Sequence, residues 1–444
     1  MQEKKISSKA KVLSRRQFLG GAAVATAGFT IIPRGVLGGA GRTPPSEKLN
    51  IACIGIAGMG ASDVGQVSTE NIVALCDVDW RHAAGTFERY PAAKKYRDFR
   101  QMLEKENKNI DAVTVSTPDN THAVAAMMAI KMGKHVYCQK PLAHDMYEVR
   151  KLTEAAREHR VMTQMGIQLH AENCVKYVVE FIKSGVIGKV QRVDIWSSKE
   201  WGGGTRPKGT QPIPETLDWD LWLGPAPYRP YHTTYLPSEW RRWWDFGTGT
   251  LGDMGCHIID PAWWALDLTY PTSVDAQPGP FNEETYPLKT TVRYEFPARG
   301  DLPPVTLTWY DGANPPPRPQ ELEKERNLPD QGGLYYGEKG VILAPHGGNP
   351  RLIPESRMKG FKLPEPTLPR EVNHYQDWLR ACKGGPKPLA NFDYSGPLTE
   401  TILLGNVAAR AGQKLAWDGP NFKVTNLPDA NKYLRREYRQ GWTL

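Results

Sequence analysis

The sequence of 444 residues contains only six cysteines, and they are scattered along the chain. None forms a Cys-x-x-Cys pair, so neither a metal knuckle nor a dithiol motif is predicted. No stretch holds ~18 or more uninterrupted strongly apolar residues, which argues against a transmembrane helix. Positive charge is also scarce after the first 42 residues, because these contain eight Lys or Arg and one Glu and so account for seven of the eight net charges. A basic nucleic-acid-binding surface is therefore not expected.

The N-terminal region has the pattern of an export signal. After a lysine-rich start, Ser14–Leu19 reads Ser-Arg-Arg-Gln-Phe-Leu, and a weakly apolar, Gly/Ala-rich run continues to Ile32. A basic region followed by a short apolar region and small residues is typical of a signal peptide, and the paired arginines match the twin-arginine signature. We therefore expect residues 1–42 to be a signal peptide and linker, the twin-arginine translocase to be a partner, and the protein to be periplasmic or otherwise exported.

After residue 46, apolar runs alternate with amphipathic stretches. Continuous apolar runs predict buried strands, and helical spacing of the apolar residues between them predicts helices. Strands that alternate with helices indicate a parallel, doubly wound sheet. The expected strands are Leu49–Gly55, Ile72–Asp77, Asp111–Ser116, His135–Cys138 and Val161–Gly166, and the expected helices are Thr121–Met132 and Asp145–His159.

A glycine-rich turn follows the first expected strand, and an acid ends the second. The turn matches Gly-x-Gly-x-x-Gly at its first and last positions, with Ala57 in place of the second glycine. Such a turn brings backbone N–H groups to a pyrophosphate at a helix N-terminus, and a carboxylate about 20 residues later accepts the ribose hydroxyls. That carboxylate repels a 2′-phosphate, so NAD is favoured over NADP, although Arg81 lies nearby. The alternative is a structural turn in a nucleotide-free sheet. The expected cofactor contacts here are Gly55, Ala57, Gly58, Met59, Gly60 and Asp77.

Three ordered motifs resemble the Gfo/Idh/MocA oxidoreductases. They are Ser116–His122, Gly133–Leu142 and Gly252–Asp260, and the resemblance covers roughly residues 46–415. It implies an N-terminal NAD-binding Rossmann domain (46–168), an α/β substrate domain with a large, mostly antiparallel open sheet (169–424), and a C-terminal tail (425–444). The second half agrees independently, because β-rich runs separated by turn residues occur there. These runs are Val190–Ser198, Thr290–Phe296, Val305–Tyr310 and Leu334–Leu343.

The same resemblance implies the catalytic residues. Lys140 lies in a Lys-Pro loop at the end of a parallel strand, where a cation stabilises negative charge that develops during hydride loss. Asp253 and His257 are four residues apart and share one face of a helix. His257 is implied to be the general acid or base, and Asp253 to orient it or to hold a sugar hydroxyl. The alternatives are a surface lysine in a turn, a metal half-site, and ordinary helix polarity; no metal is predicted.

Further residues are expected around the cofactor and the substrate. Gln139 stands where the family has Glu, so a carboxylate beside the nicotinamide is missing. Nine of the 14 tryptophans lie between Trp196 and Trp264, where they either line a carbohydrate cleft or form a core. His170 is either a substrate contact or a solvated loop histidine. The expected cofactor contacts are Thr117, Pro118, His122 and Gln139, and the expected substrate contacts are His170, Trp201 and Trp243.

Export limits the reactions that an NAD-dependent enzyme can catalyse. A soluble nicotinamide pool is not expected outside the cytoplasm, so an exported enzyme keeps its NAD and regenerates it in place. The sequence predicts an oxidoreductase that moves hydride from and to a carbohydrate or polyol hydroxyl, most simply as a homo-oligomer. One alternative is glycoside cleavage by transient oxidation, elimination, hydration and reduction. A second is a non-catalytic carbohydrate-binding protein that contains NAD.

Replacing Arg15 and Arg16 together by Lys is expected to leave the precursor in the cytoplasm, because the arginine pair is the transport address. Cell fractionation measures the distribution, with Lys9→Arg and Lys11→Arg as a control that changes nearby basic residues only. Undiminished export of the Arg15→Lys, Arg16→Lys variant would rule out this route.

Overall fold

The apolar runs of the first half form a six-stranded parallel sheet. The computed structural model describes residues 47–370 and 373–444, so the predicted signal peptide lies outside the described residues. The strand order β3-β2-β1-β4-β5-β6 is the doubly wound order expected for a dinucleotide-binding domain. Of the six strands in this sheet, β3 is the one that the sequence analysis did not predict. The strands are β1 Asn50–Ile54, β2 Asn71–Cys76, β3 Lys94–Tyr96, β4 Ala112–Val115, β5 His135–Gln139 and β6 Thr163–Gly166.

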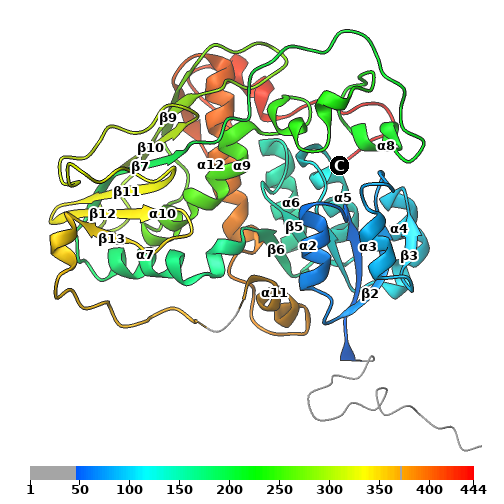
Figure 1. Ribbon diagram of the computed structural model, residues 1–444, viewed down its shortest axis with the longest axis horizontal. Coiled ribbons are helices and arrows are strands. Elements are labelled where there is room, and N and C mark those ends of the chain that lie inside the picture. The colour runs from blue at the N-terminus through cyan, green and yellow to red at the C-terminus, as the bar shows by residue number, and fades with distance from the viewer. Residues whose placement is uncertain (1–46, 371–372) are drawn as a thin grey trace, which may run out of the picture. The chain divides into compact units, whose positions relative to one another are not determined.

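Helices cover both faces of this sheet, as its continuous apolar strands require. In β1, Ala52 and Ile54 pack on the side of α4–α6, whereas Ile51 and Cys53 pack on the side of α2, α3 and α11. Helix α11 comes from the far end of the chain, so the C-terminal half completes the first domain (Figure 1). The helices are α2 Met59–Gln66, α3 Ala84–Arg89, α4 Phe99–Glu106, α5 Asp119–Lys131, α6 Met146–Glu158 and α11 His374–Cys382.

The second half builds a nine-stranded sheet in the order β13-β12-β11-β7-β10-β9-β8-β14-β15. All neighbouring strands are antiparallel except β7 and β10. Burial alternates residue by residue along β10, as expected for a sheet with one face on a core. The strands are β7 Val190–Ser197, β8 Ser273–Pro278, β9 Thr290–Phe296, β10 Val305–Asp311, β11 Gln331–Gly337, β12 Gly340–Pro345, β13 Arg351–Ile353, β14 Leu415–Asp418 and β15 Lys423–Val424.

The expected single run Leu334–Leu343 is instead a hairpin. Strands β11 and β12 pair antiparallel from Gly332 opposite Pro345 to Gly337 opposite Gly340. Gly340 has a φ of +157°, and the turn between the two strands separates what reads in sequence as one β-rich run. The predicted α/β second domain with a mostly antiparallel sheet is otherwise confirmed.

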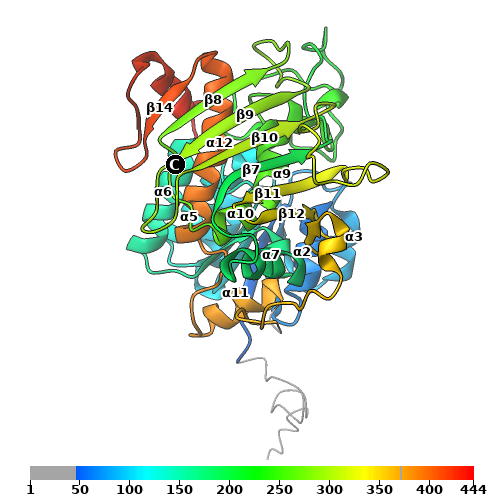
Figure 2. The ribbon, with the colours of Figure 1, turned by 90° about the vertical axis from the view of Figure 1, so that its left-hand side faces the viewer.

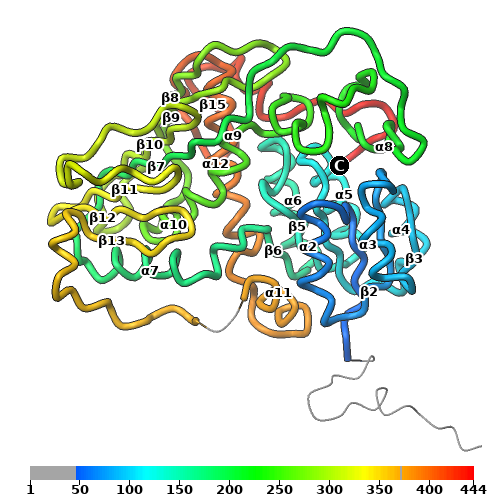
Figure 3. Tube along the Cα trace, viewed as in Figure 1, coloured from blue at the N-terminus to red at the C-terminus, as the bar shows by residue number. Residues whose placement is uncertain are grey.

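One face of the large sheet carries helices that lead toward the first domain. Residues of α7, α9, α10 and α12 share one core with the sheet. Figure 2 shows α12 behind the sheet strands and α7 below them, and in Figure 3 α12 runs between the sheet and the first domain. These helices are α7 Asn173–Lys183, α9 Gly249–Ile258, α10 Asp260–Ala265 and α12 Phe392–Ala411. Among the described residues, no helix is long and apolar enough to cross a membrane.

A tryptophan-rich segment between β7 and α9 lies over the ends of the parallel strands. Its helix α8 (Trp219–Leu223) accepts a hydrogen bond from the Asn120 side chain, and Asp218 donates its backbone N–H to Val78. Its side chains form a small core of their own. That core contains Leu217, Trp219, Trp222, Leu223, Ala226, Tyr231, Tyr235, Trp240, Trp243 and Phe246.

A buried ion pair joins α6 of the first domain to α12 of the second. Arg150 donates Nε and one Nη to the two carboxylate oxygens of Glu400, both at 2.7 Å. The same guanidinium reaches the Tyr270 hydroxyl at 3.2 Å and the Gly419 carbonyl at 2.9 Å. Glu400 is 1% exposed, so its charge depends on this single arginine for compensation.

Arg150→Ala is expected to lower the free energy of unfolding by about 3–5 kcal/mol, because it leaves the Glu400 charge buried without a partner. Urea denaturation measures the loss. Lys151→Ala on the same helix removes an exposed ion pair with Glu154 and a contact with the Tyr147 ring, and should cost less than about 1 kcal/mol. Equal stability of the two variants would contradict a structural role for the buried pair.

Candidate functional site

The glycine turn between β1 and α2 leaves no space for side chains at two positions. A Cβ on Gly60 would lie 2.0 Å from the Gly55 carbonyl oxygen, and a Cβ on Gly55 would lie 2.7 Å from the Ser116 backbone. Gly55 also has a φ of +73°, which favours glycine. The turn therefore packs its backbone against the end of β4, as a pyrophosphate-binding turn requires.

The outer side of this turn is open. A Cβ on Gly58, which has a φ of +53°, would meet only His82 Nε2 among the described residues, at 4.0 Å. Met59, the first residue of α2, is 46% exposed. Beside them, Asp77 accepts the backbone N–H groups of Ile56 at 2.8 Å and Asp79 at 2.9 Å. Burial raises the pKa of Asp77 while these two donors oppose the shift, and each carboxylate oxygen keeps capacity to accept a further hydrogen bond.

The motif after β4 forms the next wall of the site. Thr117 and Pro118 lie between β4 and α5, and both ring nitrogens of His122 lie 2.8 Å from backbone carbonyl oxygens, those of Thr117 and Pro141. His122 is 1% exposed and bridges the loop after β4 and the loop after β5, so its role is structural.

Gln139 is paired with a buried carboxylate on α2. Its Nε2 lies 3.1 and 2.9 Å from the two oxygens of Asp63, and Ser116 and Tyr375 also donate hydroxyls to Asp63, at 2.6 and 2.7 Å. Asp63 is fully buried. Burial raises its pKa, and the three donors oppose that rise. An amide at position 139 thus fits an acid at position 63.

Lys140 and Asp253 meet at the centre of the site. Lys140 directly follows β5, and its Nζ donates to the Asp253 carbonyl at 2.9 Å and to the Asp253 carboxylate. Asp253 lies on α9 and is 5% exposed. The pair therefore joins the parallel-strand edge of the first domain to a helix of the second.

Three further groups from the second domain share the Asp253 carboxylate. Trp201 donates Nε1 at 2.8 Å, Lys199 Nζ lies at 3.4 Å, and Arg241 Nε lies at 3.4 Å. Burial opposes ionisation of Asp253, but Lys140, Arg241 and Lys199 outweigh it and hold its pKa well below the usual range. These cations disfavour a divalent metal ion at Asp253 by direct repulsion.

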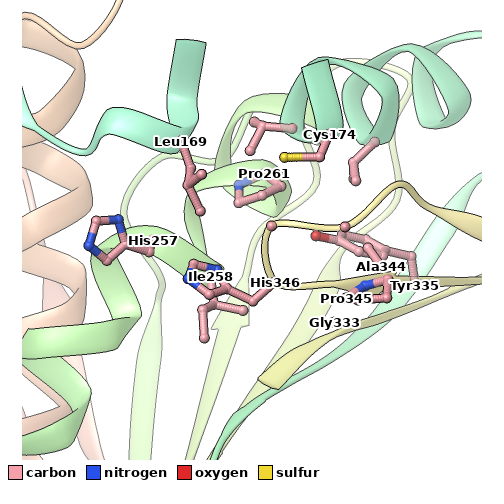
Figure 4. A pocket seen from close by; sticks show the side chains of 14 residues that line it. Leu169, Cys174, His257, Ile258, Pro261, Gly333, Tyr335, Ala344, Pro345 and His346 are labelled. Atoms are coloured by element: carbon pink, nitrogen blue, oxygen red, sulfur yellow. The ribbon is translucent and has the colours of Figure 1, made fainter. Parts of the chain in front are cut away.

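His257 lies one turn after Asp253 but makes no hydrogen bond to it. Its Nδ1 is buried without a hydrogen-bond partner among the described residues. Its ring shares a small pocket with His346, the two ring centroids being 5.9 Å apart (Figure 4). Burial, Lys140 and His346 lower the pKa of His257 well below its ordinary value, and burial and Lys199 lower that of His346. Both imidazoles are thus neutral at neutral pH.

Three sequence expectations need correction. The first is that Asp253 orients His257, whereas its hydrogen bonds go to Lys140, Lys199 and Trp201. The second is that His170 contacts the substrate, yet it is 2% exposed, lies 2.9 Å from Asp260 and stacks on Trp264. The role of His170 is packing.

The third correction concerns Trp243. It is 2% exposed and packs edge-on against Tyr235 inside the tryptophan-rich core. Aromatic residues in that segment bury one another because it spans a wide edge without strands of its own. Of the expected substrate contacts, only Trp201 reaches the Lys140–Asp253 pair.

Three residues of the site were missed from sequence. Lys199 follows β7, His346 follows β12, and Arg241 lies in the tryptophan-rich segment. The position of Lys199 just after a predicted strand was a usable signal. His346 lies in a loop and Arg241 in a short 3₁₀ helix, Glu239–Arg242, and only the tertiary fold brings them to the site.

Two family models match the chain in the order of its domains. Residues 49–167 match "Oxidoreductase family, NAD-binding Rossmann fold", and residues 171–297 match "Oxidoreductase family, C-terminal alpha/beta domain". Together they span more than half of the 444 residues. The chain belongs to the Gfo/Idh/MocA oxidoreductase family. NAD is therefore confirmed as the cofactor of the first domain.

Similar curated proteins are sugar and polyol dehydrogenases. The chain is 31% identical over 148 residues to an inositol 2-dehydrogenase of Rubrobacter xylanophilus, covering 32% of this chain and 42% of that protein. It is 27% identical to an inositol 2-dehydrogenase of Salmonella typhimurium, covering 43% and 59%. A levoglucosan dehydrogenase of Pseudarthrobacter phenanthrenivorans is 23% identical, covering 40% and 38%. The chain thus spans roughly half of each relative's length.

Solved structures share the fold. The WlbA dehydrogenase of Bordetella pertussis, in complex with NADH and UDP-GlcNAcA, superposes with a TM-score of 0.59 at 17% identity, covering 84% of this chain and 99% of that chain. A levoglucosan dehydrogenase in complex with NADH and levoglucosan gives 0.56 at 17% identity, covering 83% and 98%. At these identities the likeness confirms the two-domain fold.

The partnership of Gln139 with Asp63 predicts the effect of restoring the family's glutamate. Gln139→Glu would place a second carboxylate about 3 Å from Asp63, and two such groups cannot both ionise when buried. The pair holds a proton with a pKa above its unfolded value, so the loss of stability grows as the pH rises through and above the carboxylate range. We expect a cost of about 2–4 kcal/mol at pH 8 and less at pH 5.

Adding Asp63→Asn to Gln139→Glu should restore most of that stability, because the amide and the acid then exchange places. Urea denaturation at both pH values measures the two variants and the parent. A Gln139→Glu variant as stable as the parent at pH 8 would show that the two side chains do not interact.

Proposed function

We propose that this protein is an exported, NAD-dependent oxidoreductase that moves hydride from and to a hydroxyl group of a carbohydrate or polyol. The single observation that carries the proposal is the convergence of Lys140, Asp253 and His257 at the edge of an NAD-binding domain. Its dehydrogenase relatives support the same class of substrate, and the twin-arginine pattern supports export. Retention of NAD between turnovers follows from export.

The glycine turn and Asp77 fit the cofactor, because a Cβ is excluded at Gly55 and Gly60 while the outer backbone at Gly58 is open. When bound there, NAD supplies a ring that accepts and returns hydride. Gly58, Met59 and Asp77 would hold its pyrophosphate and ribose. Gln139 contributes no charge beside it, since its amide is committed to Asp63.

Two side chains of the protein have different roles in the reaction: one stabilises charge on the reacting oxygen, and the other accepts the hydroxyl proton. Lys140 forms an ion pair with the Asp253 carboxylate and directs positive charge at an oxygen placed beside it, which favours an alkoxide-like transition state. His257 is neutral and has an unsatisfied Nδ1, so it is able to accept the hydroxyl proton. Trp201 donates to the same carboxylate at 2.8 Å and thereby helps to fix the position of Lys140.

A second candidate, redox-neutral glycoside cleavage, is favoured by one specific observation. That reaction needs a base for a C–H proton beside the oxidised carbon as well as one for the hydroxyl proton. His346 supplies a second neutral imidazole 5.9 Å from His257, measured between ring centroids. Product analysis separates the two candidates, because cleavage releases the aglycone without net oxidation.

His257→Ala and Lys140→Ala are each expected to lower turnover roughly 10²–10⁴-fold, the usual contribution of general acid–base and charge-stabilising groups. The purified protein is incubated anaerobically with a panel of polyols, sugars and glycosides, and the absorbance of reduced cofactor and the products are followed together. Mass spectrometry of denatured protein verifies that each variant retains NAD.

His159→Ala provides the matched control, because His159 lies exposed at the end of α6. It should turn over at the parent rate. Near-parent activity in both His257→Ala and Lys140→Ala would show that the reaction does not use this site.

A further inference from the structure

The charges around Asp253 do not balance. Lys140, Lys199 and Arg241 each have Asp253 as their one ion-pair partner among the described residues. One carboxylate neutralises one cation, so two positive charges remain. Neighbouring arginines in the same segment differ, because Arg229 pairs with Asp245 and Glu284, and Arg242 pairs with Glu239.

Other ionisable groups near the cluster do not remove this excess. Asp119 is buried and accepts the Thr248 hydroxyl at 2.7 Å. Burial raises its pKa, which nearby His122, Arg241 and Lys140 oppose, and among the described residues the ion pairs of Lys140, Lys199 and Arg241 go to Asp253 and not to Asp119. His257 and His346 are neutral, and Glu200, beside Lys199 in sequence, is exposed and accepts the Ala313 N–H instead.

The two cations in excess, Lys199 and Arg241, are also the more exposed ones. The Lys199 side chain is 43% exposed and that of Arg241 is 27% exposed, whereas Lys140 is 15% and Asp253 is 6% exposed. Both outer cations lie only at 3.4 Å from the Asp253 carboxylate, at the long end of ion-pair contact. The Arg241 guanidinium lies 5.5 Å from the ring centroid of Trp201 and 4.2 Å from that of Trp240. One Nη of Arg241 donates to the Ser238 carbonyl at 3.4 Å, which leaves its other donors and those of the half-exposed Lys199 for a ligand.

Oxidised NAD carries a positive nicotinamide, so a neutral substrate would leave all of this positive charge in one partly desolvated site. An anionic group on the substrate would offset it and accept hydrogen bonds from the two free donors. We propose that the substrate is an acidic sugar, whose anionic group is bound by Lys199 and Arg241 while Lys140 faces the reacting hydroxyl. The proposal rests on the proposed function and names its substrate class.

Binding to the full, NAD-containing protein tests this inference without requiring turnover. The probes are matched pairs, D-glucuronate with D-glucose and D-galacturonate with D-galactose, and glucose 6-phosphate to distinguish a phosphate ester from a carboxylate. Isothermal titration calorimetry, or the fluorescence change expected of Trp201, gives each dissociation constant at low and high NaCl. We expect an acid to bind about tenfold or more tightly than its neutral partner, and less so at high salt.

Variants assign the preference to the two cations. Lys199→Gln and Arg241→Gln should each weaken binding of the acid about tenfold while changing binding of the neutral partner less than about twofold. Lys414→Gln, which changes an exposed lysine between α12 and β14, should leave both unchanged. The absence of any acid preference in the parent, or a preference that survives both variants, would overturn the inference.

The outcome also separates this inference from the proposed function. Acid-selective binding without any reduction of bound NAD would support the substrate class and refute hydride transfer. Oxidation of neutral sugars, with no preference for the acids, would support hydride transfer and refute the substrate class.

Discussion

One buried carboxylate organises the region where the two domains meet. Asp253 receives Lys140 from the end of β5, Lys199 from the end of β7, Arg241 from the tryptophan-rich segment and Trp201 from the loop beyond β7. Removing a charge from water is costly unless it is paired, so each of these chain segments is held where it can compensate Asp253. The position of Lys140 relative to His257 therefore depends on Asp253 rather than on a direct contact between the two.

The fold was largely predictable because its first half uses strands buried on both faces. Apolar runs located five of its six strands, and β3 was missed because Lys94 and Lys95 are exposed at the sheet edge. A local sequence pattern could not predict which distant segments of the chain complete the first domain. Helix α11 packs on the first sheet, and the end of the chain binds there too, with Arg436 pairing with Glu148. Such contacts join residues hundreds of positions apart and carry no periodic signal.

The residues of the site also fall into a group that the sequence predicted and a group that it did not. Ordered motifs gave Lys140, Asp253 and His257, which the fold brings into one region, and the glycine turn gave the cofactor position. Composition was less informative: the tryptophan concentration identified a small core around Trp219 and Trp243, not a row of ligand contacts. Lys199 and His346 were missed because each lies just after a strand has ended, and Arg241 because it lies in a single-turn 3₁₀ helix. Only the tertiary fold determines which residues these side chains meet.

Gln139 leaves the end of β5, directly before Lys140, without a carboxyl group. A glutamate at position 139 would place a second buried carboxyl group beside Asp63, whereas the Gln139 amide donates to Asp63. Asp63 is itself surrounded by the hydroxyls of Ser116 and Tyr375, so its carboxylate is committed to joining α2, β4 and α11. Asp63 therefore holds the cofactor turn in place. Among the described residues, Asp253 is the one carboxylate that pairs with Lys140.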